Sequence, residues 1–309
     1  MSSGLIFITG ATGFVGGTTA HEALKAGYHL RISVRKEWQI KKLKGIFSDY
    51  LDHLEFIIVP DITEHAAFAG KLDGVDYVLH HASPLAGGTD KQQLFPPAVK
   101  GTTRILEEAA KIPKDNGWDF SVDQDADFTG DNDAVTAMKL YQASKLLANR
   151  ASWDFMEKEK PHFSLVTIHP SFIYGHNILQ LTAEELKGST NGMLFGAIMT
   201  GIPTGSLSYV HVRDVAEAHV KALNPNIKNG SKYLLSGPKV SWKDIVDILQ
   251  KKYPKVNWKL KADTPGASWP TDTTKAEMEL GMKWRSLEEI VSEVMDQQLG
   301  FLNNNASNI

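Results

Sequence analysis

The feature that most constrains this chain is a glycine-rich turn directly after an apolar strand near the N-terminus. Leu5–Thr9 is a short run rich in apolar residues, and Gly10, Gly13 and Gly16 follow at intervals of three. The first glycine permits a tight turn, the second lets a pyrophosphate approach the backbone, and the third lets helix and strand pack closely. N–H groups at the start of the next helix can then hold the anion. The candidate binding residues are Gly10, Thr12, Gly13, Phe14, Val15 and Gly16; a structural turn without a ligand is the alternative.

Further apolar runs predict a parallel sheet behind this turn. The runs are continuous and rich in β-branched residues, which is typical of strands buried on both faces. Amphipathic stretches separate them, and this alternation predicts an α/β fold, a Rossmann doubly wound parallel sheet. The expected strands are Leu5–Thr9, Leu30–Val34, Phe56–Val59, Tyr77–His80 and Ser164–Ile168, and the expected helices are Thr18–Ala26, Gly101–Lys111 and Ala134–Lys160.

The pattern loosens after Tyr174, where Gly, Thr and Ser become frequent. We expect residues 1–174 to form the nucleotide-binding domain, with 206–225 returning to its core. Residues 175–205 and 226–309 would form a smaller, C-terminal substrate-binding part. Within these stretches we expect helices over Tyr209–Leu223, Trp242–Lys251 and Glu277–Leu299, a strand over Lys232–Leu235, and a frayed end over Asn303–Ile309.

Composition excludes several classes of protein. The 309 residues carry a net charge of −3, so there is no basic field for nucleic acid or an anionic membrane. The chain has no cysteine, which excludes disulfides, thiolate metal sites and a cysteine nucleophile. The N-terminus does not read as a signal peptide, and no apolar run reaches the ~20 residues of a membrane span. We therefore expect a cytoplasmic protein without a nucleic-acid or membrane partner; its oligomeric state stays open.

Arg35 indicates which dinucleotide the chain prefers. It follows the second expected strand, where NAD-selective sites place a carboxylate for the ribose 2′-hydroxyl. A guanidinium instead pairs with a 2′-phosphate, which a carboxylate would repel. Lys41, Lys42 and Lys44 add positive charge nearby. Arg35 and Lys42 are therefore candidate ligands of NADP; the alternative is that these cations only solvate a helix face.

Tyr141 and Lys145 are the candidate catalytic pair. They lie four residues apart on an expected helix, so both side chains occupy one face. A nearby ammonium favours the phenolate, and we expect it to lower the tyrosine pKa from about 10. The phenol could then give its proton to a carbonyl oxygen as a general acid. A surface pair without function is the alternative.

Further motifs carry a resemblance to a known family. The segments are TGATGFVGG at the glycine turn, Pro60-Asp61-Ile62-Thr63, His80-His81-Ala82-Ser83-Pro84, Tyr141-Gln142-Ala143-Ser144-Lys145, His169-Pro170-Ser171-Phe172-Ile173-Tyr174-Gly175 and Tyr209–His219. In this order, over about residues 5 to 300, they resemble the extended short-chain dehydrogenases/reductases, in the branch of dihydroflavonol 4-reductases, cinnamoyl-CoA reductases and fungal ketoreductases.

The resemblance implies NADP-dependent reduction of a ketone or aldehyde on a mid-sized aromatic or polyketide-like secondary metabolite. It further implies that Asp61 and Ile62 contact the adenine end, and that Lys145 holds the nicotinamide ribose. The residues that it places beside the nicotinamide and its ribose are His81, Ala82, Ser83, Pro170 and Ile173.

One part of the family pattern is missing. The family adds a Ser or Thr at the end of a fifth strand as a hydrogen-bond donor to the carbonyl, and about twenty residues with that strand look absent. Lys111–Ala134 is acidic, has no continuous apolar run, and is interpreted as a loop. Three interpretations stay open: Ser121 or Thr129 supplies the hydroxyl, the chain binds NADP but reduces poorly, or the sequence reflects an altered gene model or splice form. A nucleotide-sugar epimerase or dehydratase is a further alternative function.

No metal site is expected. His80 and His81 are adjacent on a strand and point to opposite faces, and a buried, hydrogen-bonded role is expected for at least one. His211 and His219 lack a zinc-site pattern, and the aspartates of 119–133 lack the spacing of a calcium loop.

Overall fold

The computed structural model describes residues 4–83, 90–111, 134–203, 206–266 and 268–306. The chain divides into two compact units, each of which is described by itself. The first contains Met1–Gly16, Ala23–Thr167 and Pro225–Ser231, and the second contains Gly17–Glu22, Ile168–Asn224 and Lys232–Ile309. Ser121, Thr129 and the stretch 112–133 lie outside the described residues.

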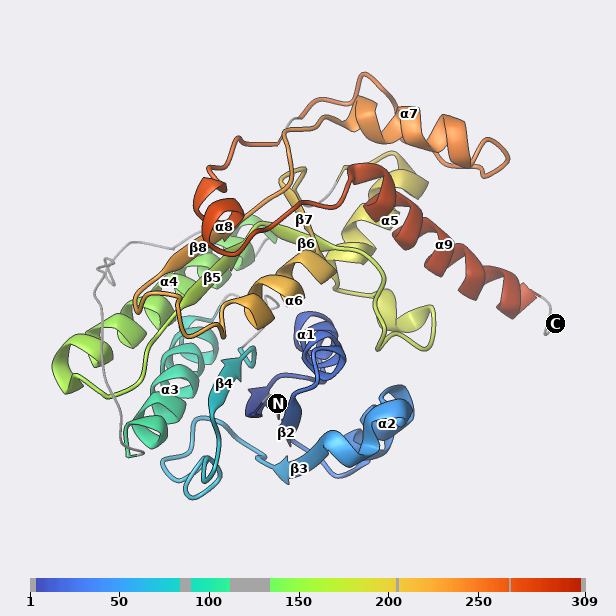
Figure 1. Ribbon diagram of the computed structural model, residues 1–309. Coiled ribbons are helices and arrows are strands. Elements are labelled where there is room, and N and C mark those ends of the chain that lie inside the picture. Colours follow the sequence, from blue (N-terminus) through green and yellow to red (C-terminus); the bar gives the residue numbers. More distant parts are fainter. Residues whose placement is uncertain (1–3, 84–89, 112–133, 204–205, 267, 307–309) are drawn as a thin grey trace. The chain divides into compact units, whose positions relative to one another are not determined.

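A four-stranded parallel sheet forms the centre of the first unit (Figure 1). The strand order is β3-β2-β1-β4, and β1 pairs in parallel with both neighbours, with Ile6 opposite Leu30 on one side and Tyr77 on the other. Ile6, Phe7 and Ile8 are fully buried, as expected for a strand covered on both faces. The strands are β1 Leu5–Thr9, β2 His29–Val34, β3 Leu54–Ile58 and β4 Tyr77–His80.

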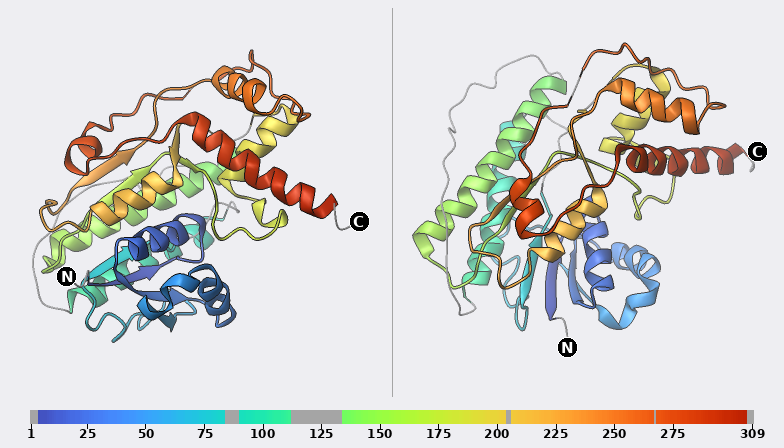
Figure 2. Two further views of the ribbon diagram at one scale, coloured as in Figure 1. Left: turned by 45° about the vertical axis from the view of Figure 1, so that its right-hand side comes forward. Right: turned by 45° about the horizontal axis from the view of Figure 1, so that its top comes forward.

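Helices connect and cover these strands. Phe7 of β1 packs edge-on against Phe68 with ring centroids 6.0 Å apart, within a cluster that includes Ile105 of α3. Helices α3 and α4 lie side by side in every view (Figures 1 and 2). The helices are α1 Phe14–Lys25, α2 Trp38–Ile46, the 3₁₀ turn η1 Ser48–His53, α3 Lys91–Ala110 and α4 Ala134–Glu159.

The second unit combines two strand pairs with five α-helices among the residues described. Strand β5 pairs with β8, and β6 pairs in parallel with β7, with Ile173 opposite Val210. The elements are β5 Thr167–Pro170, β6 Phe172–Tyr174, the 3₁₀ turn η2 Glu184–Leu186, α5 Thr190–Thr200, β7 Tyr209–His211, α6 Val212–Lys221, β8 Lys232–Leu235, α7 Trp242–Lys252, α8 Thr274–Glu279 and α9 Leu287–Ala306.

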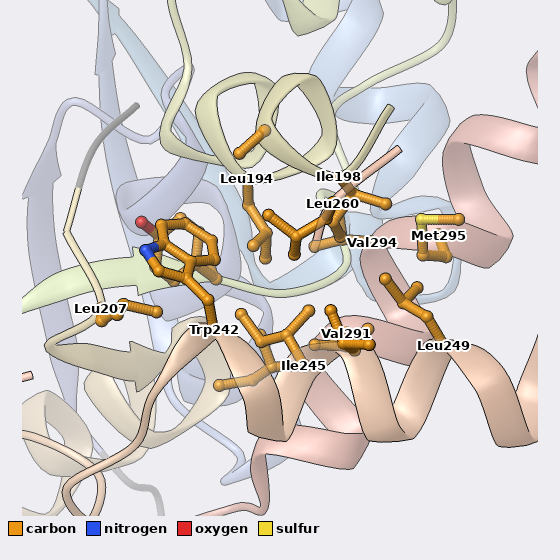
Figure 3. Packing of buried hydrophobic residues seen from close by; sticks show 14 of the residues in the cluster. Leu194, Ile198, Leu207, Trp242, Ile245, Leu249, Leu260, Val291, Val294 and Met295 are labelled. Atoms are coloured by element: carbon orange, nitrogen blue, oxygen red, sulfur yellow. The ribbon is translucent and has the colours of Figure 1, made fainter. Parts of the chain in front are cut away.

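Apolar faces of α5, α7 and α9 form the core of this unit (Figure 3). Each helix contributes residues three or four apart, which is the spacing of one helical face. Among the described residues, no helix combines the length and apolar character needed to cross a membrane. The labelled core residues are Leu194, Ile198, Leu207, Trp242, Ile245, Leu249, Leu260, Val291, Val294 and Met295.

Most predicted elements are present, but several bounds differ. The helix predicted over Tyr209–Leu223 is wrong at its start, because Tyr209–His211 is strand β7 and the helix begins at Val212. These three residues are buried and pair with β6, so tertiary pairing decides their conformation. Further differences are a shift of the strand predicted over Ser164–Ile168 to Thr167–Pro170, earlier starts of α1 at Phe14, β3 at Leu54 and α3 at Lys91, a break between α8 and α9, and a helical end over Asn303–Ala306.

A charged cluster joins α6 to α9 within the second unit. The fully buried His211 caps α6, since its Nδ1 accepts the Arg213 N–H at 3.0 Å. Its Nε2 must then carry the proton, which it donates to Glu293 at 2.8 Å. Glu293 also accepts the His176 N–H at 2.8 Å and pairs with Arg213. Burial alone would raise the pKa of Glu293, but these hydrogen bonds and the charge of Arg213 lower it to about 2.

Glu293→Gln should therefore destabilise the protein in a pH-dependent way. A carboxyl group whose pKa is depressed on folding stabilises the fold above its unfolded pKa, and this contribution is lost as pH falls through the folded pKa. We expect a loss of about 1–3 kcal/mol at pH 7, measured by urea unfolding, that disappears between about pH 5 and pH 2. Glu288→Gln, on the same helix and paired with exposed lysines, should change stability by less than about 1 kcal/mol. An equal loss for Glu293→Gln at pH 7 and pH 3 would contradict this interpretation.

Candidate active site

The predicted cofactor residues of the first unit lie along one edge of its sheet. Gly10 follows β1, Arg35 follows β2, Asp61 lies shortly after β3, and His81 follows β4. Because the strands are parallel, their carboxyl ends meet at the same edge. The sheet order therefore gives the sequence Asp61, Arg35, Gly10 and His81 across that edge. This is the edge at which open α/β sheets bind their ligands.

Packing within the chain explains why two of the three positions in the turn must be glycine. Gly10 has φ +74°, and a Cβ there would lie 2.7 Å from the Ala82 nitrogen. A Cβ on Gly16 would overlap the carbonyl oxygen of Gly10. Both positions therefore require glycine to bring the turn against the segment after β4 and to bring α1 against the turn.

Gly13 has no such explanation within the described chain. Its φ is not positive, and a Cβ there would meet only the Gly10 carbonyl oxygen at 3.4 Å, an ordinary contact distance. Gly13 and Thr12 are exposed at the start of α1. The missing side chain leaves an open cradle in front of helix N–H groups that the helix itself does not use. This cradle fits the pyrophosphate of a dinucleotide.

Arg35 and Asp61 lie close enough to influence each other. Hydrogen bonds from the N–H and hydroxyl of Thr63, both at 2.8 Å, lower the pKa of Asp61, and the charge of Arg35 lowers it further. Gln39 holds the turn after β2, since its Oε1 accepts the N–H groups of Arg35 and Lys36 at 2.9 and 3.0 Å. The Arg35 side chain is exposed and forms no ion pair with the described residues. It is therefore available to a phosphate.

The other residues predicted to bind the adenine end of the cofactor differ in how far they are buried. Lys42 is half-buried on α2. The neighbouring Lys44 forms a cation–π contact, since its ammonium lies 5.8 Å from the centre of the Phe56 ring. Ile62 packs against the core cluster of Phe7 and fills the space beside Gly101, where its Cδ1 would lie 2.7 Å from a Cβ. The side chain of Ile62 therefore packs in the core of the sheet. Its contact with the adenine end of a dinucleotide stays a prediction.

Thr9 anchors the segment that follows β4. Its carbonyl accepts the His81 N–H at 3.2 Å, and its hydroxyl accepts the Ala82 N–H at 3.2 Å. The hydroxyl proton of Thr9 is then directed to Nδ1 of His80 at 2.9 Å, which leaves the proton of the ring on Nε2. Burial and the nearby charge of Lys145 lower the pKa of His80 to about 4, so His80 is neutral at physiological pH. His80 is thus hydrogen-bonded through Nδ1, but its buried Nε2 has no partner among the described residues, so the prediction of a buried histidine with all its hydrogen bonds made is met only in part.

The catalytic pair on α4 meets a distant side chain, Ser83, just after β4. Tyr141 and Lys145 share one face of α4, as predicted, and the Lys145 ammonium lies 4.9 Å from the centre of the Tyr141 ring. The ammonium also donates a hydrogen bond to Ser83 Oγ. Burial lowers the pKa of Lys145 to about 8. The sequence resemblance placed Ser83 beside the nicotinamide ribose, but nothing in the sequence predicted its bond to Lys145.

The predicted direction of the Tyr141 pKa shift is wrong. Burial raises the pKa of Tyr141 above its usual value. The ammonium lies over the ring face, where it interacts with the π-electrons, and not at the hydroxyl. Tyr141 is therefore protonated at neutral pH, which suits a group that donates a proton.

Two predicted residues belong to the second unit. Pro170 ends β5 and Ile173 lies in β6. Their contact with a nicotinamide ring stays a prediction, as does the assignment of 175–205 and 226–309 to substrate binding. The two hydroxyl groups proposed as substitutes, Ser121 and Thr129, lie outside the described residues.

One histidine and carboxylate cluster among the described residues has the composition of a metal site. It contains His211, Glu289 and Glu293. Both ring nitrogens of His211 are engaged in hydrogen bonds, and Arg213 pairs with both carboxylates. The ring therefore has no lone pair left for a cation, and the guanidinium already compensates the negative charge. We assign this cluster to the stability of the fold.

Comparison with known proteins identifies relatives over nearly the whole chain. A ketoreductase of Aspergillus fumigatus is 46% identical, covering 98% of this chain and all of the relative. That alignment has 334 positions against 309 residues here, so at least 25 of its positions have no residue in this chain. This agrees with the prediction that a stretch of the family pattern is absent, although the total does not place the gap.

Solved structures share the fold. Yeast methylglyoxal/isovaleraldehyde reductase complexed with NADPH superimposes with a TM-score of 0.79 at 24% identity, covering 97% of this chain and 99% of that one. The related Candida albicans protein, also complexed with NADPH, gives 0.77 at 25% identity, covering 96% and 99%. These likenesses confirm the Rossmann-type fold. The model of the NAD dependent epimerase/dehydratase family matches residues 6–235, and the chain belongs to this family of extended short-chain dehydrogenases/reductases.

Proposed function

We propose that this protein is an NADPH-dependent carbonyl reductase that acts on a ketone or aldehyde. The observation that carries the proposal is the meeting of Tyr141, Lys145 and Ser83 at the carboxyl end of β4. The glycine turn adjoins the same segment, since Gly10 directly contacts its backbone. A proton donor and a dinucleotide cradle thus share one sheet edge. The 46% identity to a ketoreductase supports the same reaction class.

Each residue has a defined part in this mechanism. When bound, NADPH supplies a hydride to the carbonyl carbon. The cradle at Gly13 and the first turn of α1 bind the pyrophosphate, and Arg35 binds the 2′-phosphate. Lys145 holds the nicotinamide ribose, as the family resemblance implies. Tyr141 gives its phenolic proton to the carbonyl oxygen, so that the product is a neutral alcohol.

The substrate class follows from the resemblance to ketoreductases. We propose a mid-sized aromatic or polyketide-like secondary metabolite that enters as a small-molecule partner. A cytoplasmic location and the lack of nucleic-acid partners stay predictions from composition.

A second candidate is an NADP-binding protein with little or no turnover. This candidate requires that the at least 25 alignment positions without a residue here include the strand that carries the family's carbonyl-binding hydroxyl. Binding of NADPH without its oxidation by any carbonyl compound would support this candidate. A nucleotide-sugar epimerase or dehydratase is disfavoured, because such enzymes usually prefer NAD and Arg35 favours a 2′-phosphate.

Gly13→Ala and Gly16→Ala should separate cofactor binding from folding. A methyl group at residue 13 meets only open space and one ordinary contact, so the melting temperature should stay within about 2 °C of wild type. The same methyl group fills the proposed pyrophosphate cradle and should weaken NADPH binding at least about tenfold. Gly16→Ala forces the turn apart and should cost about 1–3 kcal/mol of stability. Unchanged NADPH affinity in a folded Gly13→Ala protein would exclude the cradle as the binding site.

Arg35→Asp should reverse the cofactor preference. Loss of the guanidinium and gain of a negative charge should raise the KM for NADPH by at least about tenfold and leave that for NADH little changed. Lys36→Asp makes the same charge change one residue away and serves as the matched control. Equal effects of both substitutions would mean that general electrostatics, and not a 2′-phosphate contact, determine the preference.

Tyr141→Phe should abolish turnover without preventing cofactor binding. Removal of a general acid typically costs about 10²–10⁴-fold in rate, so kcat for reduction of the carbonyl substrate should fall by at least about 100-fold. NADPH affinity, followed by cofactor fluorescence, should change less than about threefold. Tyr77→Phe, at the opposite end of β4, is the control. Full activity of Tyr141→Phe would refute the proposed proton donor.

A further inference from the structure

The Lys145 ammonium has few partners for a charge that is largely shielded from water. Among the described residues, it has one hydrogen-bond acceptor, Ser83 Oγ, and no carboxylate partner. The ring of Tyr141 lies on its other side. On β4, the nearest titratable group is His80, which is neutral at physiological pH and therefore does not compensate the charge. On α3, which packs against α4, the described carboxylates Glu107 and Glu108 pair with Arg104 and Lys111 and not with Lys145. The charge therefore depends strongly on a single hydroxyl.

Ser83 is well placed to define the position of that ammonium. The preceding residue, Ala82, is tied to the Thr9 hydroxyl through its N–H, and its nitrogen lies against Gly10 without room for a side chain. The backbone that carries Ser83 is thus anchored to β1. A hydroxyl on such an anchored segment offers an acceptor at a defined position, whereas the four-carbon lysine side chain alone does not hold one.

We propose that Ser83 is a positioning residue for the catalytic pair: its hydroxyl holds the Lys145 ammonium over the Tyr141 ring and keeps it protonated. This inference rests on the proposed function for its catalytic consequence. No atom of Ser83 needs to take part in the proton or hydride transfer. Its effect reaches the reaction through the charge and position of Lys145.

Loss of the hydroxyl should change how Lys145 titrates. Without its acceptor, a partly buried ammonium loses charge-assisted hydrogen bonding, and the neutral amine becomes favoured at a lower pH. Lys145 has a folded pKa of about 8, so it is charged below that pH and neutral above it. Activity that needs the ammonium should therefore fall as pH rises through about 8 in the wild type. In Ser83→Ala this fall should begin about one pH unit lower.

The first test is the pH profile of kcat/KM between pH 5.5 and 9.5. It compares wild type, Ser83→Ala, Ser83→Thr and Ser152→Ala, using NADPH and the best carbonyl substrate from a ketone and aldehyde panel. Ser152 lies on α4 and bonds the Asn149 carbonyl, so its loss removes a hydroxyl from the same helix without touching Lys145. We expect Ser83→Ala to lose about fivefold at pH 8 and little at pH 6. Ser83→Thr should keep the pH dependence of the wild type, and Ser152→Ala should follow the wild type.

Two outcomes would overturn the proposal. One is a Ser83→Ala profile with the wild-type shape, whether its level is lowered or not, since a merely structural loss acts equally at every pH. The other is an equal shift in Ser83→Ala and Ser83→Thr, which would show that the hydroxyl is not the cause. Ser83→Cys, which keeps the volume but offers a weak acceptor, replaces Ser83→Ala if that variant does not fold.

The second test does not depend on turnover. Trace labelling of Lys145 with acetic anhydride, quantified by mass spectrometry across the same pH range, reports its pKa in the full chain with and without NADPH. We expect a lower apparent pKa in Ser83→Ala than in wild type and Ser83→Thr, and equal values would refute the inference. If the wild type reduces no carbonyl compound, the proposed function fails, while this titration still decides the role of Ser83.

Discussion

The close approach of Gly10 to the segment after β4 is the contact on which the rest of the site depends. No side chain fits between Gly10 and Ala82, and Thr9 reinforces the approach with hydrogen bonds to His81 and Ala82. This contact joins the turn that would hold the pyrophosphate to the segment that carries Ser83. Since both belong to neighbouring parallel strands, a single packing constraint would set the distance between the pyrophosphate and the nicotinamide ribose of a bound dinucleotide.

Burial then determines the chemistry of the catalytic pair. It raises the pKa of Tyr141 and lowers that of Lys145, because desolvation disfavours the charged form of each group. For a reductase the raised tyrosine pKa is useful, because the tyrosine must hold a proton before it gives one away. The same burial makes Lys145 sensitive to its few polar neighbours, since a desolvated charge gains more from each hydrogen bond than an exposed one.

The sequence predicts those parts of the structure that depend on local pattern. The bounds of β1, β4 and β8 agree with the predicted runs, because each is a compact apolar segment with clear ends. Arg35 and the glycine turn are likewise found at strand ends, where short motifs suffice. Strand β7 was mistaken for helix because Tyr209–His211 takes its conformation from pairing with β6, which sequence periodicity does not show.

Contacts between distant residues account for the other failures. The bond from Lys145 to Ser83 joins residues 62 positions apart, and the position of the ammonium over the Tyr141 ring depends on side-chain directions. Spacing alone placed the two residues on one helix face and could not distinguish the ring from the hydroxyl. The sign of the tyrosine pKa shift was wrong for the same reason, because burial is a property of the fold and not of the motif.

The apparent gap in the family pattern affects the catalytic groups unequally. Within the described residues, β1 to β4, the glycine turn and the Tyr141–Lys145–Ser83 contacts are all present, and none depends on a fifth strand. Removing one oxyanion-stabilising donor typically costs about 10²–10³ in kcat, whereas a general acid contributes about 10²–10⁴. A chain that lacks the first and keeps the second should still reduce a carbonyl group, but slowly. The gap therefore favours a weakened reductase over a protein that only binds its cofactor.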